Sequence, residues 1–238
     1  MKNFNILFSI LLATLGTLVF SPIQAQKTIN VAPFTGVKLG LPVDLYIRQG
    51  TPQKVVVEAS GEVTSRIHTK ILHGNLYIIK GENDSGWWEK QQSKSEKIKI
   101  YITAPNIKNL AVSGSGSILS ENTLRGDNLK IDVSGSGSVK VAVAVGHVEG
   151  KVSGSSTMGL KGSAQNTKFR VSGSANLNAE RLAADNCQVE LSGSGNCRIQ
   201  VSNNLMSRIS GSGKVYYKGN PKKIINNASG TGSLKKIS

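Results

Sequence analysis

A Ser-Gly motif that returns at a nearly constant spacing constrains the fold of this chain more than any other feature. It occurs seven times, first as Ser113-Gly114-Ser115-Gly116-Ser117, and its first serines lie 21, 19, 19, 20, 18 and 19 residues apart. The later copies begin at Ser134, Ser153, Ser172, Ser192, Ser210 and Ser229. A fixed period of about 20 residues indicates a solenoid, in which each repeat buries its apolar face only by stacking on its neighbours.

Apolar residues keep one parity before and after each motif. In one repeat this parity is occupied by Leu129, Ile131, Val133, Gly135, Gly137, Val139, Val141 and Val143. Alternation with period two indicates strands, because successive side chains point to opposite faces. We therefore predict an all-β protein. Residues 106–238 are expected to form a right-handed, single-stranded parallel β-helix of about seven repeats of 18–21 residues.

The same parity places the motif glycines on the inner face and the serines on the outer face, although a bulge at glycine could exchange them. Because stacked coils lie about 4.8 Å apart, the serines would form outer columns roughly 29 Å long. The candidate binding hydroxyls are Ser115, Ser136, Ser155, Ser174, Ser194 and Ser212. Two readings stay open: a structural ladder of hydrogen-bonded hydroxyls, or a regular array that binds a sugar or another surface.

The N-terminal part of the chain lacks the motif. Residues 1–25 combine Lys2, a short apolar run and Ile23-Gln24-Ala25, which is typical of a cleaved secretory signal peptide. Residues 26–105 are expected to form a β segment that caps or extends the solenoid, with a first degenerate coil in the alternating stretch from Val37 to Ile47 and a hairpin at His73-Gly74-Asn75. We expect an exported protein, in the periplasm or on the outer surface of a Gram-negative cell, with no transmembrane segment in the mature chain.

The formal net charge is +15, or about +14 once Lys2 is removed with the signal peptide. Such an excess predicts attraction to polyanions or simply keeps a flat β surface soluble. In an exported protein the partners would be polyanionic or neutral glycans, or other envelope components. Nucleic acid is disfavoured, because the basic residues are scattered and few aromatic residues lie among them.

The only two tryptophans, Trp87 and Trp88, lie in the polar stretch 81–96, beside Lys90. If this segment is extended, at most one of the two rings enters a core, because neighbouring side chains point to opposite faces. An exposed tryptophan could stack on a sugar or bind a partner. Alternatively, both rings close the end of the β structure.

Cys187 and Cys197 are the only cysteines, and both fall on the apolar parity of one repeat. In an oxidising compartment they could form a disulfide, or they could be buried free thiols that serve as small core residues. The three histidines show no spacing typical of metal ligands. We predict no metal site and no cofactor.

Three acidic residues, Asp132, Glu149 and Glu190, recur before the motifs on the outward parity. A polysaccharide-active enzyme on a β-helix would need clustered carboxylates of this kind. Each one is also flanked by lysine or arginine, so a charge-paired ladder explains them more simply. The enzyme hypothesis is therefore disfavoured.

The repeated VSGSGS pattern, the signal peptide and the N-terminal β segment together resemble the auto-transporter adhesin head domain, or GIN domain, over residues 29–238. The resemblance implies a β-helix-like fold, a surface or periplasmic location and a role in adhesion, and it brings no established catalytic or binding residues to this chain. No membrane barrel follows the last repeat, so we expect no self-export.

From the resemblance and the surface composition we expect a non-enzymatic module that presents a basic, hydroxyl-rich β surface to a glycan, an envelope polymer or a protein. The alternative is a structural protein that oligomerises through the β-helix ends.

Overall fold

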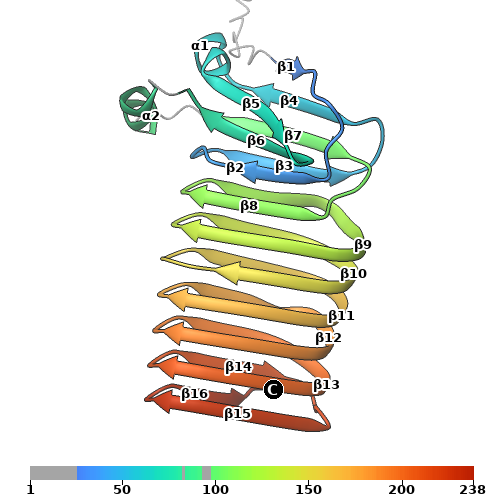
Figure 1. Ribbon diagram of the computed structural model, residues 1–238, viewed down its shortest axis with the longest axis vertical. Coiled ribbons are helices and arrows are strands. Elements are labelled where there is room, and N and C mark those ends of the chain that lie inside the picture. Colours follow the sequence, from blue (N-terminus) through green and yellow to red (C-terminus); the bar gives the residue numbers. More distant parts are fainter. Residues whose placement is uncertain (1–25, 82–83, 93–97) are drawn as a thin grey trace, which may run out of the picture.

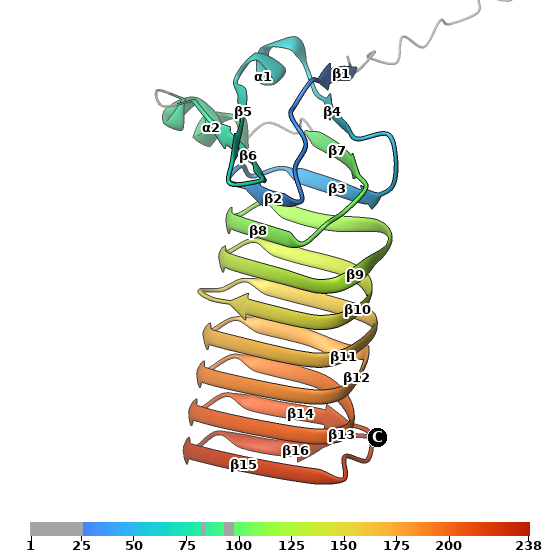
Figure 2. The same cartoon turned by 45° about the vertical axis from the view of Figure 1, so that its right-hand side comes forward.

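The computed structural model describes residues 26–81, 84–92 and 98–238; the predicted signal peptide lies outside the described residues. The chain winds as a right-handed parallel β-solenoid, with its coils stacked below an N-terminal cap (Figure 1). Turned by 45°, the coils are seen to be flattened into two facing walls (Figure 2). The predicted fold class is confirmed.

Most coils consist of one long strand that passes along both walls. These strands are β9 (Ser117–Gly135), β10 (Ser138–Val152), β11 (Thr157–Gly173), β12 (Asn176–Gly193) and β13 (Asn196–Gly211). Each begins after a Ser-Gly motif, and successive long strands pair in parallel, with register shifts in three of the four pairs. We call the wall that follows each motif wall 1, and the wall that leads into the next motif wall 2.

Shorter strands complete the two walls. On wall 2, β8 (Asn109–Gly114) precedes β9, and β15 (Lys223–Gly230) follows β13. On wall 1, β14 (Lys214–Lys218) and β16 (Ser233–Lys236) follow β13.

The core lies between the walls as columns of apolar side chains. On wall 2 the residues before the motifs stack in register and are at most 2% exposed: Val112, Val133, Val152, Val171, Leu191 and Ile209. The predicted alternation is therefore confirmed. Burying one such side chain stabilises the fold by about 1.5–3 kcal/mol relative to leaving it exposed.

One core site shows how the coils fit together. Phe169 is 1% exposed and lies in register with Gly150 of the preceding coil. A Cβ atom at position 150 would lie 2.8 Å from Cδ1 of Phe169 and 3.0 Å from the sulfur of Met158. The glycine thus provides the space that the aromatic ring fills.

The two glycines of each motif have different roles. The first, such as Gly135, lies in the left-handed region at φ 85° and is exposed, so the prediction that every motif glycine lies inside is wrong for this position. A left-handed residue turns the chain sharply, and glycine adopts this conformation without steric cost. The second, such as Gly137, is buried as predicted, and a Cβ there would lie 2.9 Å from the carbonyl oxygen of Gly116.

The N-terminal segment contributes one further coil. β2 (Gly36–Leu39) pairs in parallel with β8 on wall 2, and β3 (Asp44–Gln49) pairs in parallel with β9 on wall 1. This is the degenerate coil that the alternating residues predict. β6 (Asn75–Lys80) and β7 (Lys99–Ala104) add the next parallel layer above it.

Antiparallel strands close the top of the stack. β5 (Ile67–Leu72) forms the predicted hairpin with β6, β4 (Lys54–Glu58) pairs with β7, and β1 (Gln26–Ile29) pairs with β4. Two short helices belong to this cap: α1 (Gly61–Ser65), in which Ser60 is the N-cap, and α2 (Ser85–Gln92). Beyond β6 and β7 the pairing is antiparallel, so no further parallel coil is added at this end.

The lower, C-terminal end of the solenoid is formed by an exposed strand, β15. All eight residues of β15 are exposed, including Ile224 at 43% and Ile225 at 37%. Within the described chain no strand covers the free edge of β15, so its backbone groups are open to solvent or to another strand.

Candidate functional site

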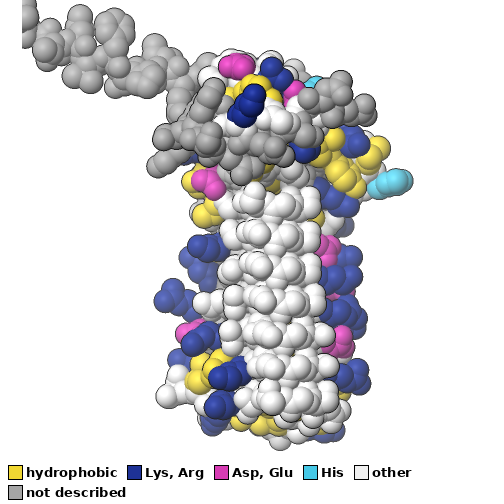
Figure 3. All heavy atoms as spheres, turned by 90° about the vertical axis from the view of Figure 1, so that its left-hand side faces the viewer, with side chains coloured by type: hydrophobic (Ala, Val, Ile, Leu, Met, Phe, Trp, Pro, Cys, Tyr) yellow, Lys and Arg dark blue, Asp and Glu magenta, His cyan; other side chains and the backbone are white. Residues whose placement is uncertain are grey.

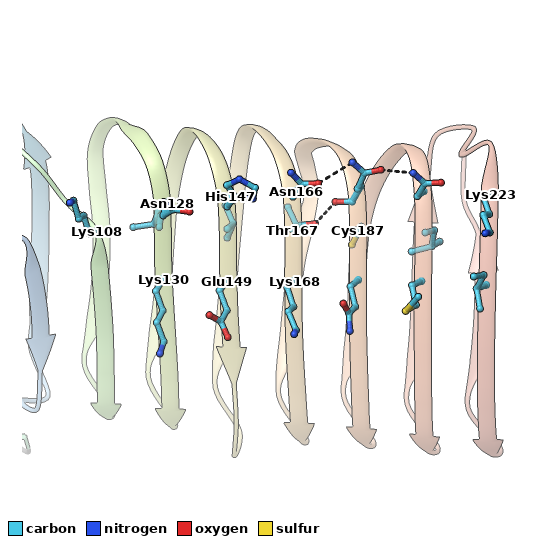
Figure 4. A pocket seen from close by; sticks show the side chains of 18 residues that line it. Lys108, Asn128, Lys130, His147, Glu149, Asn166, Thr167, Lys168, Cys187 and Lys223 are labelled. Atoms are coloured by element: carbon cyan, nitrogen blue, oxygen red, sulfur yellow. Dashed lines mark hydrogen bonds between the residues drawn. The ribbon is translucent and has the colours of Figure 1, made fainter.

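The outer surface of wall 2 carries side chains in straight columns, because successive coils pair without offset there. One column, at the start of this wall, consists of Asn128, His147, Asn166, Asn186 and Asn204. Asn186 Nδ2 donates to Asn166 Oδ1 (3.0 Å), and Asn204 Nδ2 donates to Asn186 Oδ1 (2.7 Å). We call this column the amide ladder (Figure 4).

A trough of about 770 Å³ runs beside the amide ladder along the solenoid axis. Its other side is the column Lys130, Glu149, Lys168, Gln188 and Met206, and Figure 4 shows the two rows facing the same side of the strands. Amides donate and accept hydrogen bonds, whereas lysines only donate and carry charge. The trough therefore offers a repeated polar pattern with a net positive character.

The next outer column is a ladder of ion pairs. Arg170 lies between Glu149 (3.1 Å) and Glu190 (3.2 Å), Arg208 also approaches Glu190 (3.9 Å), and Lys130 pairs with Asp132 (3.9 Å). The charge-paired ladder predicted for the three acidic residues is confirmed. Such exposed pairs add little stability individually, about 0–1 kcal/mol each.

A second axial trough, of about 980 Å³, lies between this ion-pair ladder and the first serines of the motifs, including Ser153, Ser172, Ser192 and Ser210. These serines were not among the predicted candidates. They follow the buried residues directly, so the alternation itself could have placed them on outer wall 2 next to the charged column.

The predicted serines occupy the edge between the walls. Ser115, Ser136, Ser155, Ser174, Ser194 and Ser212 are all exposed. Figure 3 shows this edge as an uncharged column with lysine and arginine side chains on both flanks. Among the described residues of these columns, one hydroxyl-to-hydroxyl bond occurs, from Thr231 Oγ1 to Ser212 Oγ (3.0 Å). Most of these serine hydroxyls therefore face outward and are not linked to one another by hydrogen bonds.

The two tryptophans lie on helix α2 rather than on an extended segment. Trp88 is 3% exposed and belongs to the core, whereas Trp87 is half-buried. The indole Nε1 of Trp87 donates to Glu62 (2.9 Å), and the Arg66 guanidinium lies 4.7 Å from its ring centroid. Lys90 is exposed on the same helix. Trp87 and Lys90 are therefore accessible to a ligand, whereas the ring of Trp88 is buried.

Cys187 and Cys197 are buried free thiols, the second of the two readings that the sequence left open. Burial raises the pKa of both thiols to about 12. The desolvated thiolate is disfavoured in such surroundings, so both groups stay protonated and unreactive at neutral pH.

Among residues 26–81, 84–92 and 98–238, no group of three or more metal-ligating side chains comes together. In the same residues, none of the helices has the length and apolar character needed to cross a bilayer.

These observations define a parallel β-solenoid with polar, mostly cationic outer walls and open troughs along its axis. The chain belongs to the family described as "Putative auto-transporter adhesin, head GIN domain", which matches residues 33–221. The predicted family resemblance is confirmed. None of the curated proteins compared with the chain matches it.

Solved structures of similar proteins share the fold. A "putative adhesin" from Bacteroides fragilis has a TM-score of 0.81 at 23% identity, covering 90% of this chain and 96% of its own. A "putative adhesin" from Parabacteroides merdae has a TM-score of 0.70 at 18% identity, with the same coverage. A "putative lipid binding protein" from Parabacteroides distasonis has a TM-score of 0.68 at 20% identity, again with 90% and 96% coverage.

Proposed function

We propose that this protein is an exported, non-enzymatic adhesion module that binds a glycan chain along the outer surface of wall 2. The observation that carries the proposal is the amide ladder and its trough of about 770 Å³, which repeat in step with the coils. Membership of the adhesin head family supports an exported, surface-associated role.

The chemistry of the trough favours a polyhydroxylated ligand. Sugar hydroxyls both donate and accept hydrogen bonds, and so do the amides of Asn128 and Asn166. Lys168, which forms no ion pair within the described residues, could in addition pair with an acidic group on the polymer. A ligand that engages several equivalent sites gains avidity without a deep pocket, because each later contact forms within one complex.

The acidic residues of this wall support a binding role over hydrolysis. Glu149 and Glu190 both pair with Arg170, and Asp132 pairs with Lys130. A glycosidase needs one carboxyl held as an acid and a second held as a nucleophile or base. In this wall each of these carboxyl groups is instead paired with a basic side chain.

The test is a glycan array probed with the mature chain at low and high salt, beside three variants. Asn128→Ala/His147→Ala removes two exposed side chains of the trough that make no side-chain hydrogen bond in the described structure. Ser136→Ala/Ser155→Ala alters the serine edge, and Trp87→Ala alters the half-buried ring on α2.

Binding that survives high salt and is lost only in Asn128→Ala/His147→Ala supports the amide trough as the site. Loss only in one of the other two variants would move the site to the serine edge or to α2. If no glycan binds, or if all three variants bind like the parent protein, the proposal fails.

The alternative function is end-to-end assembly, which is favoured by one observation. β15 leaves its edge and both Ile224 and Ile225 exposed at the lower end of the solenoid. Exposed edges of this kind pair readily with further strands. Light scattering over a concentration series tests it: a mass that rises with concentration and returns to the monomer value in Ile225→Lys supports assembly, and a constant monomer mass excludes it.

A further inference from the structure

A separate group of basic side chains projects from wall 1, on the opposite side of the molecule from the amide trough. Lys161 of β11 and Arg181 of β12 are direct neighbours in the parallel register, and Lys140 of β10 lies diagonally beside them. All three are exposed and line an open trough of about 500 Å³. We call Lys140, Lys161 and Arg181 the wall-1 basic cluster.

A glycine, Gly159, lines this trough beside Lys140. Gly159 pairs with Lys140 in the register, and a Cβ at position 159 would lie 3.4 Å from Cγ of Lys140. The lysine stem therefore lies over a position that has no side chain of its own. Ser120 and Asn178 also line the trough, so hydroxyl and amide groups accompany the three cations.

The positive charge of the cluster is not balanced by the protein. None of its three members forms an ion pair within the described chain, and the one acid that lines the trough, Glu180, pairs with Arg198 (3.3 Å). Arg198 is also held over the ring of Tyr216, 5.3 Å from its centroid. On wall 2, by contrast, Arg170 and Arg208 each have a glutamate partner.

Like charges directly opposite each other on neighbouring strands destabilise a sheet. Lys161 and Arg181 are such a pair, on backbones about 4.8 Å apart. A bound anion would convert this repulsion into attraction. The repulsion between Lys161 and Arg181 is therefore a reason to expect that an anion binds here.

We propose that the wall-1 basic cluster binds a phosphate group. Phosphate monoesters carry a charge of about −1.5 to −2 at neutral pH, which matches a cluster of three cations better than a single carboxylate does. The planar guanidinium of Arg181 suits two-point contact with phosphate oxygens, and the lysines act as point charges. The Ser120 hydroxyl accepts a bond from the backbone N–H of Ala142 (2.8 Å), so its own proton can be donated to the anion.

The test uses isothermal titration calorimetry and thermal unfolding of the mature chain with inorganic phosphate. Acetate serves as the carboxylate comparison, and vesicles of phosphatidylcholine with or without phosphatidic acid distinguish a lipid headgroup from free phosphate. The test variant is Lys161→Gln/Arg181→Gln. The matched control is Lys214→Gln/Lys218→Gln, which removes the same charge from wall 1 of a coil nearer the C-terminal end.

The proposal expects phosphate, or vesicles that contain phosphatidic acid, to bind the parent protein and the control, and to bind the test variant at least about tenfold more weakly, equal to about 1.4 kcal/mol. Phosphate should raise the melting temperature of the parent protein but not of the test variant. Without phosphate the test variant should melt at or above the temperature of the parent protein, since the repulsion is gone.

Three results would overturn the proposal: no binding of either probe, equal weakening in the control, or acetate binding as tight as phosphate binding. The glycan array that tests wall 2 is independent of all three, because the test variant leaves that wall unchanged.

Discussion

The tight turn at the Ser-Gly edge can be tested by comparing alanine substitutions at two equivalent glycines. Gly114 and Gly135 hold the same place in successive motifs and have similar left-handed φ angles, 93° and 85°. They differ in what a Cβ would meet. At Gly114 nothing lies within 4 Å, whereas at Gly135 the carbonyl oxygen of Gly114 would lie 2.8 Å away.

This difference separates two energetic costs. A left-handed alanine costs about 1–2 kcal/mol, and the reduced entropy of the unfolded chain returns about 0.4–1 kcal/mol of it. Gly114→Ala should therefore lower the free energy of unfolding by about 1 kcal/mol. Gly135→Ala bears the same cost plus about 1–3 kcal/mol for forcing two coils apart, giving about 2–4 kcal/mol in total.

Urea unfolding followed by circular dichroism measures both variants against the parent protein. Equal losses would show that adjacent coils do not approach closely at this edge, and the account of the motif would be refuted. Gly135→Val should lose at least as much stability as Gly135→Ala, because it too strains the turn and the contact with Gly114 of the preceding coil.

Three other predictions concern the core, the charged surface and the thiols. Phe169→Ala should lower the free energy of unfolding by about 3–5 kcal/mol in urea, because the ring fills the space over a glycine. Arg170→Gln should cost less than about 1 kcal/mol at low salt, and this cost should shrink further in about 1 M salt, since both of its ion pairs are exposed. The thiols of Cys187 and Cys197 should react with a thiol reagent at about pH 8 only after unfolding. Burial raises the pKa of both thiols from 9.0 to about 12, so their contribution to stability is complete below pH 9.0. Between pH 9.0 and 12 the unfolded chain releases these protons and the folded chain keeps them, so the free energy of unfolding falls as the pH rises. Urea midpoints that do not change over this range would contradict the prediction.

The period of the motif and the alternation around Val133 were enough to predict the solenoid. Both are local properties: a strand that alternates apolar and polar side chains has one buried face, and a repeat of about 20 residues stacks on the next. The alternation from Val37 to Ile47 likewise placed a further coil before the first motif.

The amide ladder was missed although its signal is present in the sequence. Asn128, His147, Asn166, Asn186 and Asn204 recur at 19, 19, 20 and 18 residues, the same period as the serines. All five lie outside the Ser-Gly motif that predicted the solenoid. Extending the periodic comparison to polar residues outside the motif would have found them.

By itself, the sequence determined the repeat, the strand alternation, the apolar columns and the family, because each follows from spacing along the chain. Only the tertiary structure decided which side chains of different coils become neighbours. Lys161 and Arg181 lie 20 residues apart in the sequence, yet they stand side by side without an acid, while Arg170 lies between two. A shift of one strand by a single residue would break each of these columns, since the side of the wall on which a residue lies depends on the register. The helix at Ser85–Gln92 shows the same dependence, because packing against the cap buries Trp88 and leaves Trp87 at the surface.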